Sequence, residues 1–94
     1  MEIATKTTRI IRDDATVQMK ALYDVLSEKL NQYYFEKWEV TDWQVRITLR
    51  EGSTLDDDMF YIIDKYARAQ RDKEHRTGHI IVSTEDHKLV IAVW

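Results

Sequence analysis

An uninterrupted alternation of apolar and polar side chains runs through Trp43-Gln44-Val45-Arg46-Ile47-Thr48-Leu49-Arg50. Successive side chains of a β-strand point to opposite faces, so this period of two predicts a strand with one buried and one exposed face. The predicted inward set is Trp43, Val45, Ile47 and Leu49. Gly52-Ser53-Thr54 follows and leads into apolar residues spaced three and four apart, which predict a helix. The chain therefore belongs to the mixed α and β class.

This predicted helix begins near residue 55 and is marked at both ends. Ser53 or Thr54 is the expected N-cap, and Asp56–Asp58 fill the first turn, where negative charge is favourable. The buried stripe is expected to consist of Leu55, Met59, Ile62, Ile63, Tyr66, Ala67 and Gln70. Gly78 is well placed to end the helix after a basic last turn.

The N-terminal third predicts a strand followed by another helix. β-branched residues dominate 3–12 and favour a strand. This segment also carries the cations Lys6, Arg9 and Arg12, which suit an edge strand because charge there discourages pairing with another chain. Asp13 and Asp14 are the expected cap of a helix that runs to about Tyr34.

The segment between this helix and the alternating strand leaves two possibilities open. Trp38 and Val40 are in the opposite alternation phase to the residues that follow. Such a reversal requires either a β-bulge or a tight turn, and Thr41-Asp42 is the place for it. If it is a turn, residues 37–41 form a short strand of their own.

The C-terminal residues predict a hairpin. His79–Val82 and Leu89–Trp94 are continuous apolar runs joined by the polar segment Ser83–His87. Continuous apolarity indicates burial on both faces of a strand. The predicted order is β-α-β-α-β-β in an α+β two-layer sandwich, with both helices on one face of a mixed or antiparallel sheet. We expect residues 1–94 to form a single globular domain.

Composition excludes several classes of protein. The 94 residues carry a net charge of −3. Because the chain contains no cysteine, it offers no disulfide and no thiolate chemistry. Its two glycines are too few and too far apart for a glycine-rich phosphate loop. No apolar stretch approaches the ~18–20 residues that span a bilayer, and no signal-peptide core is visible. We expect a cytoplasmic protein without a membrane partner, a bound cofactor or an evident small-molecule substrate.

Three histidines, His75, His79 and His87, are the candidates for catalysis or metal binding. His75 and His79 are four residues apart, a spacing that suits two metal ligands on one helical face, but Gly78 lies between them and is expected to end the helix. No metal site is therefore predicted, and an enzyme with a histidine-centred site ranks third among the possible functions. No nucleophile is paired with a base, so we expect no enzyme.

Nucleic-acid binding is the second-ranked function. The candidate phosphate ligands are Arg46 and Arg50 on the exposed face of the strand, with Arg68 and Arg71 on the basic end of the second helix. Acidic residues between these cations weaken the field, and the strand offers no exposed aromatic ring for bases to stack on. A nucleic-acid partner is therefore not expected.

A surplus of aromatic and apolar residues favours protein–protein contact instead. Tyr33, Tyr34, Phe35, Trp38 and Trp43 are too dense for all five to lie in the core, and the last strand is apolar on both faces. The predicted interface residues are Trp94, Val90, Tyr34 and Trp38. The predicted function is a small non-catalytic binding protein, either an inhibitor of the antitoxin or immunity type or an adaptor, with a protein partner or a homodimer as its complex. By association only, a compact, acidic, cysteine-free chain of this size is expected to be a phage or mobile-element type of small protein.

Overall fold

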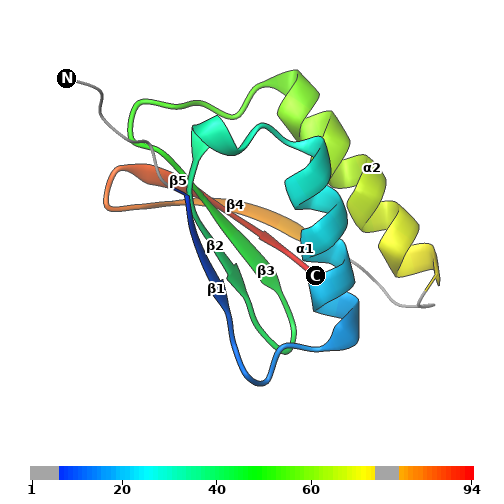
Figure 1. Cartoon of the computed structure of the whole chain (residues 1–94). Coiled ribbons are helices and arrows are strands. Elements are labelled where there is room, and N and C mark those ends of the chain that lie inside the picture. The colour runs from blue at the N-terminus through cyan, green and yellow to red at the C-terminus, as the bar shows by residue number, and fades with distance from the viewer. Residues whose placement is uncertain (1–6, 74–78) are drawn as a thin grey trace.

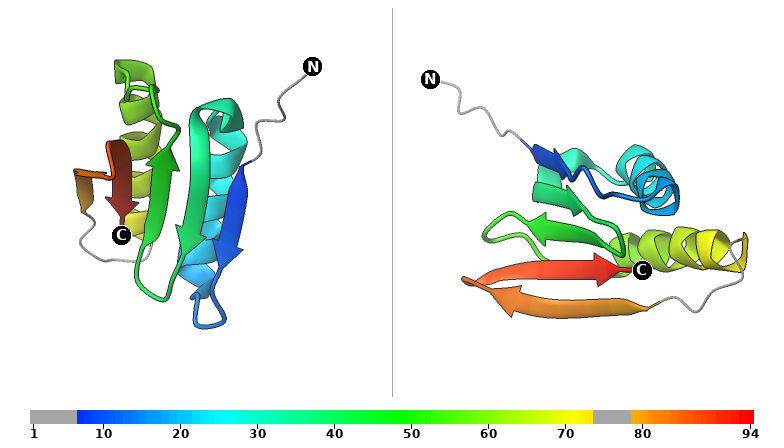
Figure 2. Two further views of the ribbon diagram at one scale, coloured as in Figure 1. Left: turned by 90° about the vertical axis from the view of Figure 1, so that its left-hand side faces the viewer. Right: turned by 90° about the horizontal axis from the view of Figure 1, so that it is seen from below.

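In a computed structural model, which describes residues 7–73 and 79–94, two helices pack on one face of a five-stranded sheet (Figure 1). Both helices lie behind the sheet when it is viewed face-on (Figure 2). The elements are β1 Thr8–Ile11, α1 Val17–Lys29, the 3₁₀ turn η1 Gln32–Tyr34, β2 Phe35–Val40, β3 Val45–Leu49, α2 Asp57–Lys73, β4 Ile80–Glu85 and β5 Lys88–Val93. The predicted α+β sandwich is confirmed, with one strand more than its minimal order.

The sheet is mixed, with the strand order β1-β2-β3-β5-β4. β1 and β2 are parallel neighbours joined through α1, and every other pairing is antiparallel. A parallel pair cannot be closed by a tight turn, so the α1 connection is what permits it. β1 and β4 are the two edges of the sheet.

The phase reversal before the alternating strand is a turn. The Thr41 hydroxyl oxygen accepts hydrogen bonds from the backbone N–H groups of Trp43 and Gln44, and β2 and β3 pair as a hairpin with Val40 opposite Val45. The separate short strand therefore exists, as β2. The prediction that Trp43 points inward is wrong: it lies in the turn, and 54% of its surface is exposed.

Gln44, predicted on the exposed face, is also placed wrongly, because it is 5% exposed, whereas the alternation within β3 itself is confirmed. Val45, Ile47 and Leu49 are fully buried, whereas Arg46 and Thr48 are partly exposed on the other face. The core between sheet and helices is formed by Met19, Leu22, Tyr23, Leu26, Leu30, Phe35, Trp38, Val40, Val45, Ile47, Leu49, Met59, Ile63, Ile91 and Val93. All of these apolar side chains point into the space between the sheet and the two helices. Their shared burial there determines the two-layer arrangement.

α1 is shorter than predicted at both ends. Its N-cap is Thr16, whose side chain accepts from the Met19 N–H, and not Asp13 or Asp14. The helix ends at Lys29 because Leu30 is extended and the Asn31 side chain caps the separate turn η1. Two competing caps therefore interrupt the helical pattern that extends to Tyr34 in the sequence.

α2 also begins later than predicted. Asp56 Oδ1 accepts a hydrogen bond of 2.8 Å from the Met59 N–H and takes the capping role predicted for Ser53 or Thr54. Ser53 is still part of a turn, because its N–H donates to the Arg50 carbonyl and Gly52 adopts a φ of +86°. The predicted stop at Gly78 lies outside the described residues.

The C-terminal hairpin is confirmed, with a two-residue turn at Asp86 and His87. Both have positive φ, 50° and 65°, as the tight turns favoured by twisted hairpins require. Burial on both faces holds for β5 and is wrong for β4, where Ile81 is 51% and Val82 42% exposed. The reason is position: β5 lies between β3 and β4, whereas β4 is an edge.

Candidate protein-binding surface

Trp38 does not belong to any surface of the folded chain, so its prediction as an interface residue is wrong. Its side chain is 0% exposed. The indole packs edge-on against Tyr23, with ring centroids 5.3 Å apart, and against Phe35 at 5.4 Å. The aromatic residues crowded around the end of α1 thus divide, with Phe35 and Trp38 in the core and the tyrosines outside.

Val90 is likewise buried, although it faces away from the helices. β3 and β4 flank it, and an ion pair of 3.0 Å joins Arg46 of β3 to Glu85 of β4 on that face. A second ion pair, of 2.8 Å, joins Lys88 of β5 to Glu36 of β2, and this hydrogen bond raises the pKa of Lys88. Long charged side chains therefore shield Val90 from solvent, and the predicted exposed patch on the last strand is absent.

Trp94 keeps a partly exposed position at the end of β5. Its ring packs against Trp43 at 5.1 Å and His79 at 5.5 Å. Two backbone hydrogen bonds exchanged with His79 hold it in the sheet. Trp43 packs against Trp94 and is the more exposed of the two indole rings.

Tyr34 is a predicted interface residue that is exposed in the structure, as are three other aromatic residues of η1 and the start of α2. Tyr33 and Tyr34 of η1 are 60% and 40% exposed, and Phe60 and Tyr61 of α2 are 43% and 64% exposed. η1 and the first turns of α2 stand at the same end of the molecule (Figures 1 and 2). We call these four residues the aromatic end.

The backbone that carries the aromatic end is held by hydrogen bonds. The Asn31 side chain accepts from the Tyr33 N–H at 3.0 Å. Arg50 donates from its side chain to the Tyr33 carbonyl at 2.9 Å and from its backbone to the Tyr34 carbonyl at 3.0 Å. The two tyrosine rings also meet edge-on at 5.5 Å. The η1 backbone that carries the two tyrosines is therefore held in place before any partner binds.

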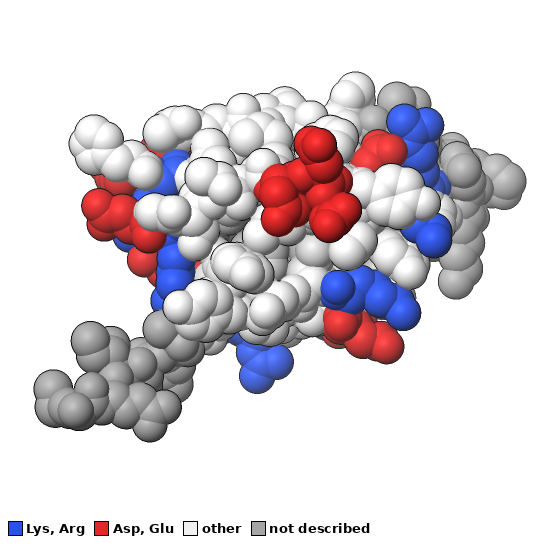
Figure 3. Space-filling view, turned by 90° about the horizontal axis from the view of Figure 1, so that it is seen from above, with Lys and Arg blue, Asp and Glu red and all other residues white. Residues whose placement is uncertain are grey.

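Negative charge accompanies the aromatic end. Asp56, Asp57 and Asp58 are all exposed at the start of α2. Viewed from this end, an acidic cluster stands amid a largely uncharged surface (Figure 3). Asp57 and Asp58 make no ion pair with another described residue, so their charge is available to a partner.

Of the four arginines proposed for nucleic-acid binding, the three whose side chains the structure describes do not form one surface. Arg46 is paired with Glu85, and Arg68 is paired with Asp64 at 3.0 Å within α2, in the other layer of the sandwich. The Arg50 side chain donates hydrogen bonds to the Tyr33 carbonyl and the Thr7 hydroxyl. The side chain of Arg71 lies outside the described residues. Local acids, a carbonyl and a hydroxyl thus already bind Arg46, Arg50 and Arg68, three of the cations that the sequence suggested for phosphate.

We therefore expect no nucleic-acid binding tighter than about 10 μM at about 150 mM salt, the range of weak unspecific association. Fluorescence anisotropy with labelled single- and double-stranded DNA and RNA measures this directly. If these arginines did contact phosphates, the log–log salt slope would change by close to one unit per contact removed. Sub-micromolar, salt-sensitive binding would contradict the expectation.

The histidines remain apart where the structure describes them. His79 precedes β4 and His87 lies in the turn after it, so the length of a six-residue strand separates them. His75 lies outside the described residues. Across 7–73 and 79–94, no group of three or more histidine or acidic side chains could hold a metal ion.

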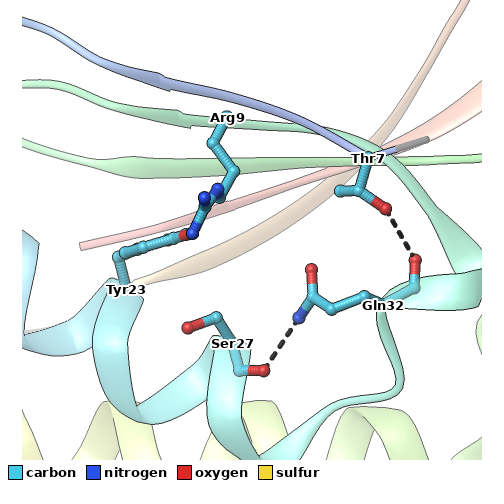
Figure 4. A pocket seen from close by; sticks show the side chains of 5 residues that line it. All are labelled: Thr7, Arg9, Tyr23, Ser27 and Gln32. Atoms are coloured by element: carbon cyan, nitrogen blue, oxygen red, sulfur yellow. Dashed lines mark hydrogen bonds between the residues drawn. The ribbon is translucent and has the colours of Figure 1, made fainter.

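A polar cavity of about 320 Å³ opens between β1 and α1 (Figure 4). Its lining residues are Thr7, Arg9, Tyr23, Ser27 and Gln32. Arg9 donates to the Tyr23 hydroxyl at 3.4 Å, and this hydrogen bond raises the pKa of Arg9. The Gln32 side-chain amide donates to the Ser27 carbonyl and the Thr7 hydroxyl lies 2.9 Å from the Gln32 carbonyl. The groups of the wall mainly bind one another.

Sequence reasoning did not single out Phe60 and Tyr61 as exposed rings, and it predicted the strand β4 without identifying it as an edge of the sheet. A signal existed for the two rings, because they fall outside the predicted buried stripe of α2 and hence on its solvent side. No comparable local signal marks β4 as an edge.

Neither helix of the described segments is long and apolar enough to cross a bilayer. Compared with protein-family models, curated proteins and solved structures, the chain shows no significant match.

Proposed function

We propose that this chain is a small non-catalytic binding protein that acts through protein–protein contact, as an inhibitor of the antitoxin or immunity type or as an adaptor. The observation that carries the proposal is the aromatic end, four large rings that are 40–64% exposed on a hydrogen-bonded backbone. Tyrosine and other aromatic side chains dominate the energetics of protein interfaces. An uncovered group of them is a natural anchor for a partner.

Preorganisation supports this role. Binding costs the entropy of ordering side chains and loops, and a surface that is already fixed avoids part of that cost. The hydrogen bond that Arg50 donates and the one that Asn31 accepts hold η1, and α2 holds the backbone of Phe60 and Tyr61. The Lys65 amine lies 5.9 Å from the centroid of the Tyr61 ring, which restrains that ring further.

The chemistry of the surface defines the partner. Apolar rings call for an apolar patch, and the exposed Asp57 and Asp58 beside them call for positive charge. The partner we propose is a protein surface on which apolar side chains are flanked by arginine or lysine. Opposite charge at the rim mainly accelerates association, whereas the buried rings set the lifetime of the complex.

Affinity capture from host lysate, followed by reconstitution with the purified partner, tests the proposal. We expect Tyr33→Ser with Tyr61→Ser to weaken the complex by roughly thirtyfold or more, because truncating a hot-spot tyrosine costs about 2 kcal/mol or more. The matched control is Val17→Ser, since Val17 is 78% exposed on α1. Asp57→Asn with Asp58→Asn should slow association at low salt.

The Kd values of the purified complex, measured by calorimetry, decide the outcome. A partner that binds the wild type and the control equally, and the tyrosine variant weakly, supports the aromatic end as the binding surface. Equal affinity for all three proteins assigns the contact to another surface and contradicts the proposal.

A further inference from the structure

β4 carries an open pairing edge. It pairs with β5 on one side only, and no described segment pairs with its other side. Five of its six residues are exposed, including Ile81 at 51% and Val82 at 42%. Such an edge is a template for a strand from another chain.

The hairpin hydrogen bonds determine which backbone groups face outward. His79 and Trp94 exchange both of their backbone hydrogen bonds. In an antiparallel pair this pattern repeats at every second residue, so Ile81, Ser83 and Glu85 also direct their N–H and C=O groups toward β5. The N–H and C=O groups of Ile80, Val82 and Thr84 therefore point away from the sheet.

β4 also lacks the features that protect edge strands. Its residues Ile80–Thr84 contain no charge and no proline, and its register with β5 is regular. The opposite edge, β1, is only four residues long and carries Arg9. Short edges, charges and bulges are the usual means of preventing strand addition. Within the part of the chain that the structure describes, one edge is protected and the other is free.

We propose that two copies of this chain pair through β4, antiparallel, about a two-fold axis at Val82 and normal to the sheet. In this register Val82 faces Val82 of the other copy, and Ile80 faces Thr84 in both directions. In each of these pairs, the outward-facing N–H and C=O groups of one residue form hydrogen bonds with the C=O and N–H groups of the other. The two five-stranded sheets become continuous, with the helices of both copies on the same face.

The sequence of β4 is complementary to itself in this register. His79 of one copy lies opposite Glu85 of the other, which places a hydrogen-bond donor beside a carboxylate at each end. An axis at Ile81 or Ser83 pairs fewer of the outward-facing groups, because Thr84 or Ile80 then lies opposite residues beyond the strand. This self-complementarity is why the occupant is a second copy and not an unrelated strand. The pairing uses no residue of the aromatic end and stands independently of the proposed function.

A charge swap at the axis tests the dimer. In both Val82→Asp and Val82→Lys, two like charges lie opposite each other in a homodimer, so each variant alone is expected to be monomeric. An equimolar mixture of the two pairs opposite charges and is expected to dimerise. Light scattering after size-exclusion chromatography, over a dilution series from low to high micromolar, measures the mass. Val17→Asp is the surface control and should dimerise like the wild type.

Amide hydrogen exchange provides the second readout. The N–H groups of Val82 and Thr84 are free in the monomer and should gain protection as the wild-type concentration rises. The N–H groups of Ser83 and Glu85 already bind β5 and should change little. A wild type that stays monomeric throughout the series, a Val82→Asp variant that still dimerises, or a mixture that stays monomeric would overturn the proposal.

Discussion

Replacing Trp38 by alanine is expected to lower the free energy of unfolding by about 3–5 kcal/mol, the usual cost of deleting a buried aromatic side chain. Trp38 is 0% exposed and makes edge-on contacts with Tyr23 and Phe35. The loss combines removed apolar burial with the cavity left between α1 and β2. Urea unfolding followed by circular dichroism measures this loss of unfolding free energy. The loss is a large fraction of the total, because native domains are only marginally stable.

Trp43→Ala is the matched control, because it makes the same change at a ring that is 54% exposed. It should cost less than about 1 kcal/mol, as surface substitutions generally do. Trp38→Phe separates two further effects. The Trp38 Nε1 finds no hydrogen-bond acceptor among the described residues, so phenylalanine removes a buried unpaired donor as well as part of the ring. We expect a smaller loss than for alanine, and equal losses at Trp38 and Trp43 would contradict the assignment of Trp38 to the core.

Ile47→Ala is expected to destabilise the fold by about 2–4 kcal/mol, whereas Thr48→Ala should cost well under 1 kcal/mol. The two residues are neighbours in β3 and differ in the face they occupy. Ile47 is 0% exposed between Trp38 of β2 and Ile91 of β5, its register partners in the sheet. Thr48 is half-buried on the face without helices.

This comparison uses the strand as its own control, since both variants leave the hydrogen bonds of the β3 backbone unchanged. Thermal and urea unfolding of the two proteins, at the same pH and salt, give the difference directly. A similar loss at both positions would mean that the sheet is buried on both faces at β3, and the two-layer arrangement would be wrong.

The sequence by itself determined the elements that depend on neighbours along the chain. Three local patterns predicted the correct type of element. They are the alternation of 45–49, the helical spacing after residue 55 and the polar break before residue 88. The predicted N-caps of both helices were wrong. Thr16 and Asp56 act as caps although acceptors a few residues upstream had the same local chemistry, because the path into each helix is fixed by the turn before it.

Only the tertiary structure decided which predicted surface residues are exposed. Val90 is 3% exposed although it faces away from the helices, because β5 lies between β3 and β4, whose residues Arg46 and Glu85, 39 apart in the chain, form an ion pair on that face. Trp38 is enclosed by α1, whereas Tyr34, four residues earlier, stays outside because η1 ends the helical path before β2 begins. The open edge of β4 exists because β5 pairs with β3 and so takes the inner position in the sheet. Local patterns report the two faces of an element, but exposure depends on which distant element packs against each face.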